Sequence, residues 1–275
     1  MPREAWAMFE ELMSAGAMLA ASIVGGTGMG ILGAYVVGMR IPFLAIVTSH
    51  AAMLGAVTAC IIGWPILPTS FAAALVSVML LGFLTQPGGR TEMNVHSSIL
   101  FALFMGLTFI AMGMFRGDMT PILGFMWGSL LFVSEGDVAV MAILLICLGI
   151  FGAVFHREMK AIIFSRRLAD LSGIRVRIIN MVFLGLAAAI ITAHIKIIGG
   201  ILIYSLLSCP AAAAFETGRG FRAVLILSGL FGLAGALGGF LISWYANLPT
   251  GACITLCSVG IYGIVHVFNR VQRNV

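Results

Sequence analysis

Long apolar runs constrain the fold of this chain more than any other feature of its sequence. Hydrophobic residues make up 61% of the 275 positions and charged residues only 9%, whereas a soluble domain carries about 25% charged residues. A chain with so few polar groups cannot cover a water-facing surface, so we predict a polytopic membrane protein. The runs do not alternate with a period of two, which argues against a barrel and predicts an all-α membrane helix bundle.

We predict about eight to nine transmembrane helices, because most of the apolar runs are near the ~20 residues needed to cross the hydrocarbon core. The nine predicted membrane segments are Leu12–Val37, Pro42–Gly63, Leu67–Leu84, Val95–Met114, Val138–Phe155, Ile178–Ala193, Ile197–Phe215, Ala223–Tyr245 and Gly251–Phe268. A further run, Pro121–Val133, is too short to span comfortably and is predicted to be re-entrant or interfacial. Pro210 is a potential break inside Ile197–Phe215. Residues 1–275 are predicted to form a single transmembrane domain.

The polar segment His156–Arg177 fixes the predicted orientation of the chain. It reads HREMKAIIFSRRLADLSGIRVR and holds six of the fifteen Lys and Arg residues. Placing it in the cytoplasm puts twelve basic residues inside and leaves only Arg3, Arg116 and Lys196 outside. The positive-inside rule therefore predicts an external N-terminus and a cytoplasmic C-terminus in the cell (cytoplasmic or inner) membrane. Because loop topology explains the basic excess, no nucleic-acid partner is predicted.

A short amphipathic helix is predicted within this polar segment. Ser165 is a suitable N-cap for a helix over Arg166–Ser172, and Gly173 is a suitable terminator. Leu168 and Leu171 form an apolar pair at i,i+3. The polar residues of this predicted helix are Arg166, Arg167 and Asp170. Such a helix suits a groove on a partner protein, or it lies on the inner leaflet, held by arginine and anionic lipid; residue chemistry leaves both open.

His50 is a candidate metal contact because it lies in the middle of an apolar span, where an ionisable side chain usually has a function. Neutral imidazole is also the commonest metal ligand. Met53 lies on nearly the same helical face, as does Ile46 one turn earlier. The alternative is a histidine that is hydrogen-bonded to a neighbouring helix.

Two other histidines lie near predicted interfaces. His96 begins the fourth span, four residues after Glu92, at the inner interface, which favours a capping or structural role. His194 and Lys196 are predicted to occupy an outer turn and to reach towards water.

Two further patterns are interpreted as helix contacts. Gly28-Met-Gly30-Ile-Leu-Gly33 matches GxGxxG, but a dinucleotide site needs a preceding strand and an acidic residue about 20 positions on, and neither is present. We interpret these glycines as points of close helix approach. Cys253 and Cys257 share a helical face, where small packing residues are favoured over a thiolate metal pair. No GxxxxGK[ST] motif occurs, so any ATP hydrolysis belongs to another subunit.

Several segments together resemble the permease subunit of the zinc, manganese and iron ABC importers. The family pattern FxGDxxSHAxxxG is similar to Phe43–Gly55, and LFGxLLxVxxxD is similar to Met126–Asp137. KxVGxLLxxxLLxxPAAxA resembles Lys196–Ala214, LPxG matches Leu248–Gly251, and AxxxGI resembles Ala169–Ile174. The resemblance covers nearly the whole chain, and the order and spacing of the motifs make it specific.

One departure from the family pattern affects the expected metal contacts. The family's aspartate, four residues before the histidine, is Ile46 here. In the family this Asp–His pair is implicated in handling the metal, so the resemblance carries over His50 without its acid. Glu92 matches by position an acidic residue at the start of the family's fourth span, and Met53 is a further candidate. The resemblance thus implies an incomplete ligand set, which fits a different metal, a chelated metal or a diverged copy.

The resemblance also implies the partners and the mechanism. The chain would be a translocation subunit and not an enzyme, with divalent Zn, Mn or Fe as its substrate. Two permeases, identical or related, would form the pathway by alternating access, and an extracytoplasmic metal-binding protein would deliver the metal. Cytoplasmic ATPases carrying ATP and Mg would dock on the short helix. The implied docking residues are Arg166, Arg167, Leu168, Asp170, Leu171 and Gly173.

A stand-alone secondary transporter or channel is the main alternative. Such a protein needs intramembrane acids for ion coupling, and this chain has almost none in the middle of its spans. A membrane enzyme would need a cluster of histidines and acids at one interface, whereas the five histidines are scattered.

Overall fold

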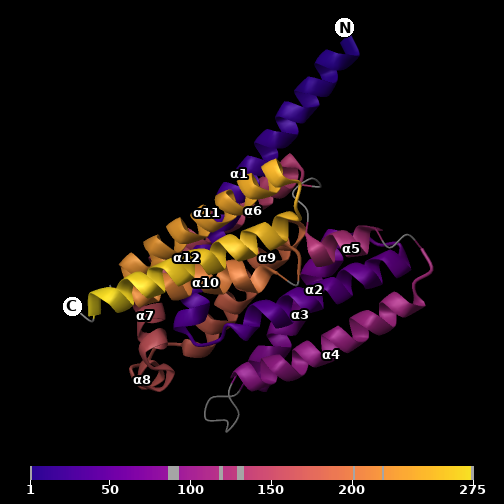
Figure 1. Cartoon of the computed structure of the whole chain (residues 1–275). Helices are drawn as coiled ribbons and strands as arrows, with labels where there is room; N and C mark the ends of the chain where they lie inside the picture. The colour runs from indigo at the N-terminus through magenta and orange to yellow at the C-terminus, as the bar shows by residue number, and fades with distance from the viewer. Residues whose placement is uncertain are drawn as a thin grey trace.

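The computed structural model describes residues 2–85, 93–117, 120–128, 133–200, 202–218 and 220–273, and every element among them is a helix (Figure 1). The helices are α1 (Pro2–Gly38), α2 (Phe43–Ile62), α3 (Ile66–Leu84), α4 (Met93–Met114), α5 (Thr120–Trp127), α6 (Glu135–Val154), α7 (His156–Phe164), α8 (Arg166–Leu171), α9 (Val176–Ile198), α10 (Ile203–Glu216), α11 (Phe221–Ala246) and α12 (Thr250–Arg273). The start of α1 and the end of α12 lie at opposite ends of the bundle (Figure 1). The predicted all-α membrane bundle is confirmed.

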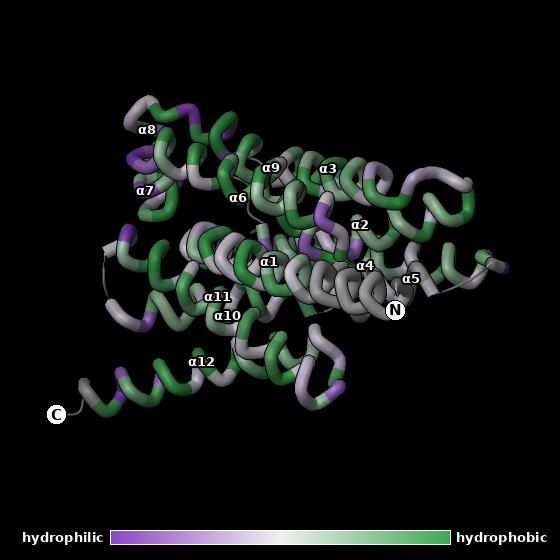
Figure 2. The backbone as a smooth tube through the Cα atoms, turned by 90° about the horizontal axis from the view of Figure 1, so that it is seen from above, coloured by the Kyte–Doolittle hydropathy of each residue, from purple (hydrophilic) through white to green (hydrophobic). Residues whose placement is uncertain are grey.

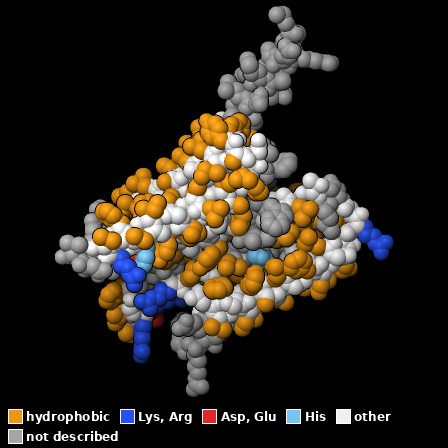
Figure 3. Space-filling model, viewed as in Figure 1, with side chains coloured by type: hydrophobic (Ala, Val, Ile, Leu, Met, Phe, Trp, Pro, Cys, Tyr) orange, Lys and Arg blue, Asp and Glu red, His pale blue; other side chains and the backbone are white. Residues whose placement is uncertain are grey.

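Within the described part of the chain, eight helices are long and apolar enough to cross a membrane: α1, α2, α3, α4, α6, α9, α11 and α12. They match eight of the predicted segments. Figure 2 shows that these helices are hydrophobic along most of their length, whereas α7 and α8 carry many hydrophilic residues. The visible face of the bundle is covered with hydrophobic side chains, and most of its Lys and Arg residues gather near α7 and α8 (Figure 3). This distribution is what a lipid-facing surface requires.

One of the nine predicted segments, Ile197–Phe215, is corrected by the structure. Helix α9 continues to Ile198, the chain turns at Gly199 with φ of 86°, and α10 begins only at Ile203. Gly199 and Gly200 mark this turn in the sequence, but the apolar residues on both sides of them predicted one continuous segment. With 14 residues, α10 is about 21 Å long at 1.5 Å per residue, which is shorter than the hydrocarbon core. Pro210 lies inside α10 without ending it.

Helix α10 nevertheless returns the chain towards the α7–α8 end of the bundle. Ser205, near its start, donates a hydrogen bond to Thr255 of α12 at 2.9 Å, and Glu216, at its end, lies 3.2 Å from His266 of α12. Each pair is separated by 50 residues, so α10 and α12 run parallel in one register. The chain therefore reaches α11 at the same end as α7.

The short apolar stretch after α4 forms α5, which is too short to span, as predicted. Its eight residues reach about 12 Å, and it lies beside α2 and α9. Gly128 follows it with φ of 70°, and a Cβ there would collide with Ile198 and with the backbone nitrogen of Gly199. Thus α5 ends directly against the α9–α10 turn. The interfacial or re-entrant placement itself stays a prediction.

Two of the three glycines of the GxGxxG pattern, Gly30 and Gly33, make close helix contacts, as the structural interpretation predicts. A Cβ at Gly30 of α1 would collide with the carbonyl oxygen of Ser228 in α11, and one at Gly33 would collide with that of Leu207 in α10. A Cβ at Gly28, by contrast, would meet only ordinary contacts beyond 3.6 Å. Small residues thus let α1, at the centre of the bundle, approach two helices closely.

Candidate transport pathway and coupling segment

The side chain of His50 is buried near the middle of α2, as its apolar sequence context predicts. Its Nδ1 lies 2.9 Å from the carbonyl oxygen of Ile46, and its ring packs edge-on against Phe101 of α4 with centroids 4.8 Å apart. A carbonyl only accepts, so this contact selects the tautomer with hydrogen on Nδ1. The lone pair on Nε2 is then the available acceptor or metal-ligating atom.

The residues around His50 offer few other ligands. Met53 is buried one turn further along α2, and Ile46 presents a half-buried apolar side chain where the family has an acid. Ser49 donates a 2.9 Å hydrogen bond to the carbonyl oxygen of Gly200, which ties α2 to the α9–α10 turn. Among the described residues, no group of three or more His, Cys, Asp and Glu side chains could hold a metal. Glu92 lies outside the described residues.

The prediction that His194 reaches towards water at an outer turn is wrong. Its side chain is 1% exposed, because α9 continues past it to Ile198. Nδ1 bonds the carbonyl oxygen of Ile190 at 2.6 Å, and Nε2 points towards Gly28 of α1 without a hydrogen-bond partner among the described residues. His96 is half-buried, and its predicted structural role is not tested because its neighbour Glu92 is not described.

The predicted short helix in the polar segment is confirmed together with its cap and terminator. Ser165 is the N-cap of α8 and accepts a 3.3 Å hydrogen bond from the backbone nitrogen of Leu168. The helix ends at Leu171, one residue earlier than predicted, and Gly173 follows with φ of 81°. Local residue chemistry therefore suffices to predict where this helix begins and ends.

Three large apolar side chains project from α8 and from the end of α7. Phe164 is 83% exposed, Leu168 54% and Leu171 77%. Ala169, on the opposite face of α8, is buried. Phe164 was not among the predicted docking residues, although an apolar residue beside a helix cap in a polar segment is a usable signal. Together with the exposed Arg167 and Asp170, these side chains form the coupling surface: Phe164, Arg167, Leu168, Asp170 and Leu171. Gly173 is exposed beside it.

Arg166 faces the bundle and not the coupling surface. Its Nη2 donates a 3.2 Å hydrogen bond to Oδ1 of Asn180 in α9 and lies 3.7 Å from the sulfur of Met93 in α4. Burial lowers the pKa of this guanidinium below its ordinary value. The side chain therefore anchors α8 to the two spans that lie behind it.

This anchoring predicts a coupled pair. We expect Arg166→Ala and Asn180→Ala each to destabilise the protein by about 1–3 kcal/mol, the usual contribution of a hydrogen bond to a charged group. The double variant should be only slightly less stable than either single variant, since both changes remove the same hydrogen bond. Thermal unfolding in detergent measures this, with the exposed Arg167→Ala as the control. Additive losses would contradict the anchoring role.

The fold and these sites define a class. A bundle of helices long and apolar enough to span a membrane, with a buried histidine inside it and a short exposed helix at one end, is the architecture of a multi-pass membrane protein. The model of the ABC 3 transport family matches residues 10–269, so the chain belongs to that family. It is the permease component of an ABC importer and not an enzyme. The resemblance drawn from the sequence motifs is confirmed.

Individual relatives agree with this assignment. The chain is 27% identical over 229 residues to a protein of Thermotoga maritima named a probable metal transport system membrane protein, covering 82% of this chain and 80% of that one. It is 24% identical over 250 residues to the manganese transport system membrane protein MntC of Listeria innocua, covering 91% and 89%. Its fold is similar to that of PsaBC from Streptococcus pneumoniae in complex with Fab, with a TM-score of 0.82, 19% identity and coverage of 99% and 100%.

Proposed function

We propose that this chain is the permease subunit of an importer for a divalent transition-metal ion, Zn, Mn or Fe, driven by a separate ATPase that binds ATP and Mg. The observation that carries the metal assignment is the buried imidazole of His50, whose Nδ1 is occupied by a backbone carbonyl and whose Nε2 is available. Imidazole nitrogen suits these metals. The names of the manganese and metal transport relatives support the same cargo.

His50 acts as a transient contact in this proposal. A pathway site must bind its ion weakly enough to release it. With Ile46 in place of an acid, the ion meets a neutral ligand, so binding at this point is weaker than at an Asp–His pair. Met53 adds a soft thioether on the same helix. Glu92 is the further candidate ligand, by its position in the sequence.

The proposed mechanism is alternating access between two permease chains, identical or related. The bundle end that carries α7 and α8 is cytoplasmic, which the gathering of basic residues there supports (Figure 3). The N-terminus is then external and the C-terminus cytoplasmic. An extracytoplasmic metal-binding protein delivers the ion to the opposite end. ATP shifts the equilibrium between the outward-open and inward-open states only to the extent that it binds one state more tightly than the other.

The ATPase docks on the coupling surface in this proposal. Exposed apolar side chains flanked by one Arg and one Asp suit a groove of matching shape on a soluble partner. Arg166 does not contact the ATPase in this proposal. It holds α8 in position for docking through its hydrogen bond to Asn180 of α9. Movement of the docked ATPases then reaches the spans through α7 and α9, between which α8 lies in the chain.

The test is ATP-driven uptake in liposomes that contain the permease with an ATPase and a binding protein from neighbouring genes. Zn²⁺, Mn²⁺ and Fe²⁺ are compared separately. We expect His50→Ala to reduce uptake of the true cargo at least tenfold. Loss even of a side chain that only orients a metal ligand typically costs about 10–100-fold, and among the described residues no group of three or more His, Cys, Asp and Glu side chains could hold the metal instead.

His194→Gln is the matched control, since it changes a second buried histidine, which faces α1. The amide of the introduced glutamine can still donate a hydrogen bond to the Ile190 carbonyl. It should retain uptake. Normal uptake by His50→Ala would make His50 structural. Metal movement without any ATPase would overturn the importer proposal in favour of a channel or secondary carrier.

A further inference from the structure

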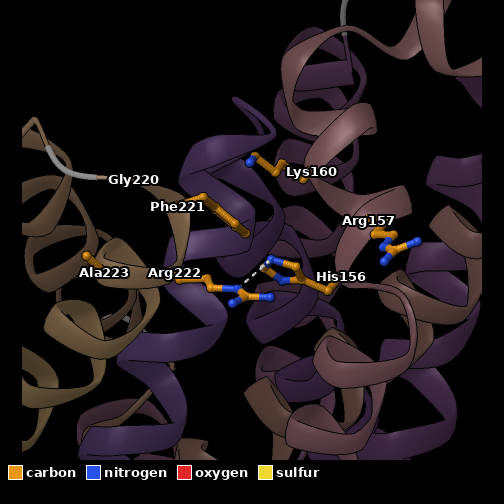
Figure 4. A pocket seen from close by; sticks show the side chains of 7 residues that line it. All are labelled: His156, Arg157, Lys160, Gly220, Phe221, Arg222 and Ala223. Atoms are coloured by element: carbon orange, nitrogen blue, oxygen red, sulfur yellow. Dashed lines mark hydrogen bonds between the residues drawn. The ribbon is translucent and has the colours of Figure 1, made fainter.

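A cavity of about 530 Å³ opens between the start of α7 and the start of α11 (Figure 4). Its lining residues are His156, Arg157, Lys160, Gly220, Phe221, Arg222 and Ala223. Lys160 reaches over the cavity towards Phe221, whereas Arg157 lies on the far side of His156. The size is that of a small-ligand site, and neither the proposed metal pathway nor the coupling surface uses it.

Four of the described residues that line the cavity are basic, and none of them is acidic. Nε of Arg222 donates a 3.3 Å hydrogen bond to Nε2 of His156, which fixes the guanidinium against α7 and leaves its two Nη groups for another acceptor (Figure 4). Lys160 adds a second cation from the next turn of α7, whereas the guanidinium of Arg157 points away from Arg222 (Figure 4). Glu158, the acid on α7, does not line the cavity. Lys160 and Arg222 thus place two cations at one cavity, and their charge favours an anion there.

Two helix N-termini add to this charge. Helices α7 and α11 both begin at the cavity, and neither has a side-chain cap hydrogen bond. Gly220, the N-cap of α11, has no side chain that could supply one. The first amide groups of a helix lack intrahelical partners, and together with the helix dipole they favour phosphate.

The position of the cavity indicates an amphiphilic occupant. The candidate span of α6 ends at Val154, two residues before His156, and the candidate span of α11 begins at Phe221. Ile150 and Val154 of α6 and Ile226 of α11 are more than half exposed. The cations therefore stand where the apolar, lipid-facing surface of the spans ends. A free anion would use the cations alone, whereas a lipid also uses the apolar side chains next to them.

We propose that the phosphate headgroup of an acidic phospholipid binds between the N-termini of α7 and α11. Lys160 and Arg222 hold the phosphate, and the acyl chains lie along the exposed apolar side chains of the adjoining spans. Because α7 leads directly into the coupling surface, the lipid fixes the position of α8 relative to α11. The inference depends on the membrane-spanning fold and is independent of the transported substrate.

The test compares lipids retained by the purified protein after transfer from nanodiscs that contain equal amounts of phosphatidylglycerol and phosphatidylcholine with identical acyl chains. Native mass spectrometry counts the bound lipids. We expect enrichment of phosphatidylglycerol on the wild-type protein. Lys160→Gln with Arg222→Gln should lower that enrichment about fivefold for each cation removed, since one basic side chain near an anionic lipid contributes about 1 kcal/mol.

Arg177→Gln with Arg270→Gln removes two exposed cations that lie outside the cavity and should leave the enrichment unchanged. Lys160→Arg with Arg222→Lys keeps the charge and should restore most of it. Equal enrichment in both Gln variants would overturn the proposal. So would displacement of the bound lipid by millimolar inorganic phosphate, which would identify a site for free anions, or occupation of the cavity by the ATPase in the assembled complex.

Discussion

Leu171→Asp should abolish ATP-driven transport while leaving the permease folded and in the membrane. Leu171 is 77% exposed and lies at the end of α8, so the bundle does not depend on it. In the docked complex the same side chain would be buried in a partner groove, where an unpaired carboxylate is strongly unfavourable. Loss of a buried anchor weakens binding by about 2 kcal/mol or more, which is about 30-fold in affinity.

The measurement is the affinity of the ATPase for the permease in nanodiscs, followed by uptake in liposomes. Leu171→Met preserves size and apolarity and should behave as wild type. Arg167→Ala, which removes a rim charge, should mainly change the association rate and its salt dependence. If α8 instead lies on the inner leaflet, Leu171→Asp will leave the ATPase affinity unchanged, and the docking role of the coupling surface will have to be abandoned.

Helix α8 is an example of a feature that local sequence chemistry can predict. Ser165 and Gly173 determine where α8 begins and ends, because capping and a positive φ involve only neighbouring backbone groups. The spans were predictable for a similar reason, since each one is identified by its own length and apolarity. The exposure of Leu168 and Leu171 also followed from their place in a polar segment.

Features that depend on distant residues were not predictable in this way. Arg166 shares the polarity of Arg167, and only the approach of Asn180, fourteen residues later in the chain, turns it inward. His194 and Lys196 are polar residues in an apolar sequence, which predicts a turn there, whereas α9 continues to Ile198 and ends at Gly199. The basic cavity is likewise assembled from α7 and α11, whose paired residues His156 and Arg222 are 66 positions apart.

The candidate metal contact His50 lies between these two cases. His50 stood out because an ionisable residue inside a span is rare, and the structure does bury it. The carbonyl that orients its ring belongs to Ile46, one turn away, so this contact follows from helix geometry alone.

Gly30→Ala should prevent stable folding, whereas Gly28→Ala in the same motif should be tolerated. A Cβ at Gly30 would collide with the carbonyl oxygen of Ser228 and lie 3.2 Å from the Cα of Gly229. Both are backbone atoms of α11, so no side chain can rotate away. Overpacking of a core costs about 1–3 kcal/mol even where side chains adjust, and here α1 would have to separate from the helix against which it packs most extensively.

At Gly28 the nearest atoms to a Cβ are Cδ1 of Leu145 at 3.7 Å and Nε2 of His194 at 3.8 Å. These are ordinary van der Waals distances, and alanine favours a helix over glycine by about 1 kcal/mol. The two variants therefore make the same chemical change on one helix with opposite expected signs. The measurement is the temperature at which half of the detergent-solubilised protein remains monodisperse. Equal midpoints would show that close contact between α1 and α11 does not hold the bundle together, although van der Waals contact is a main source of helix association in lipid.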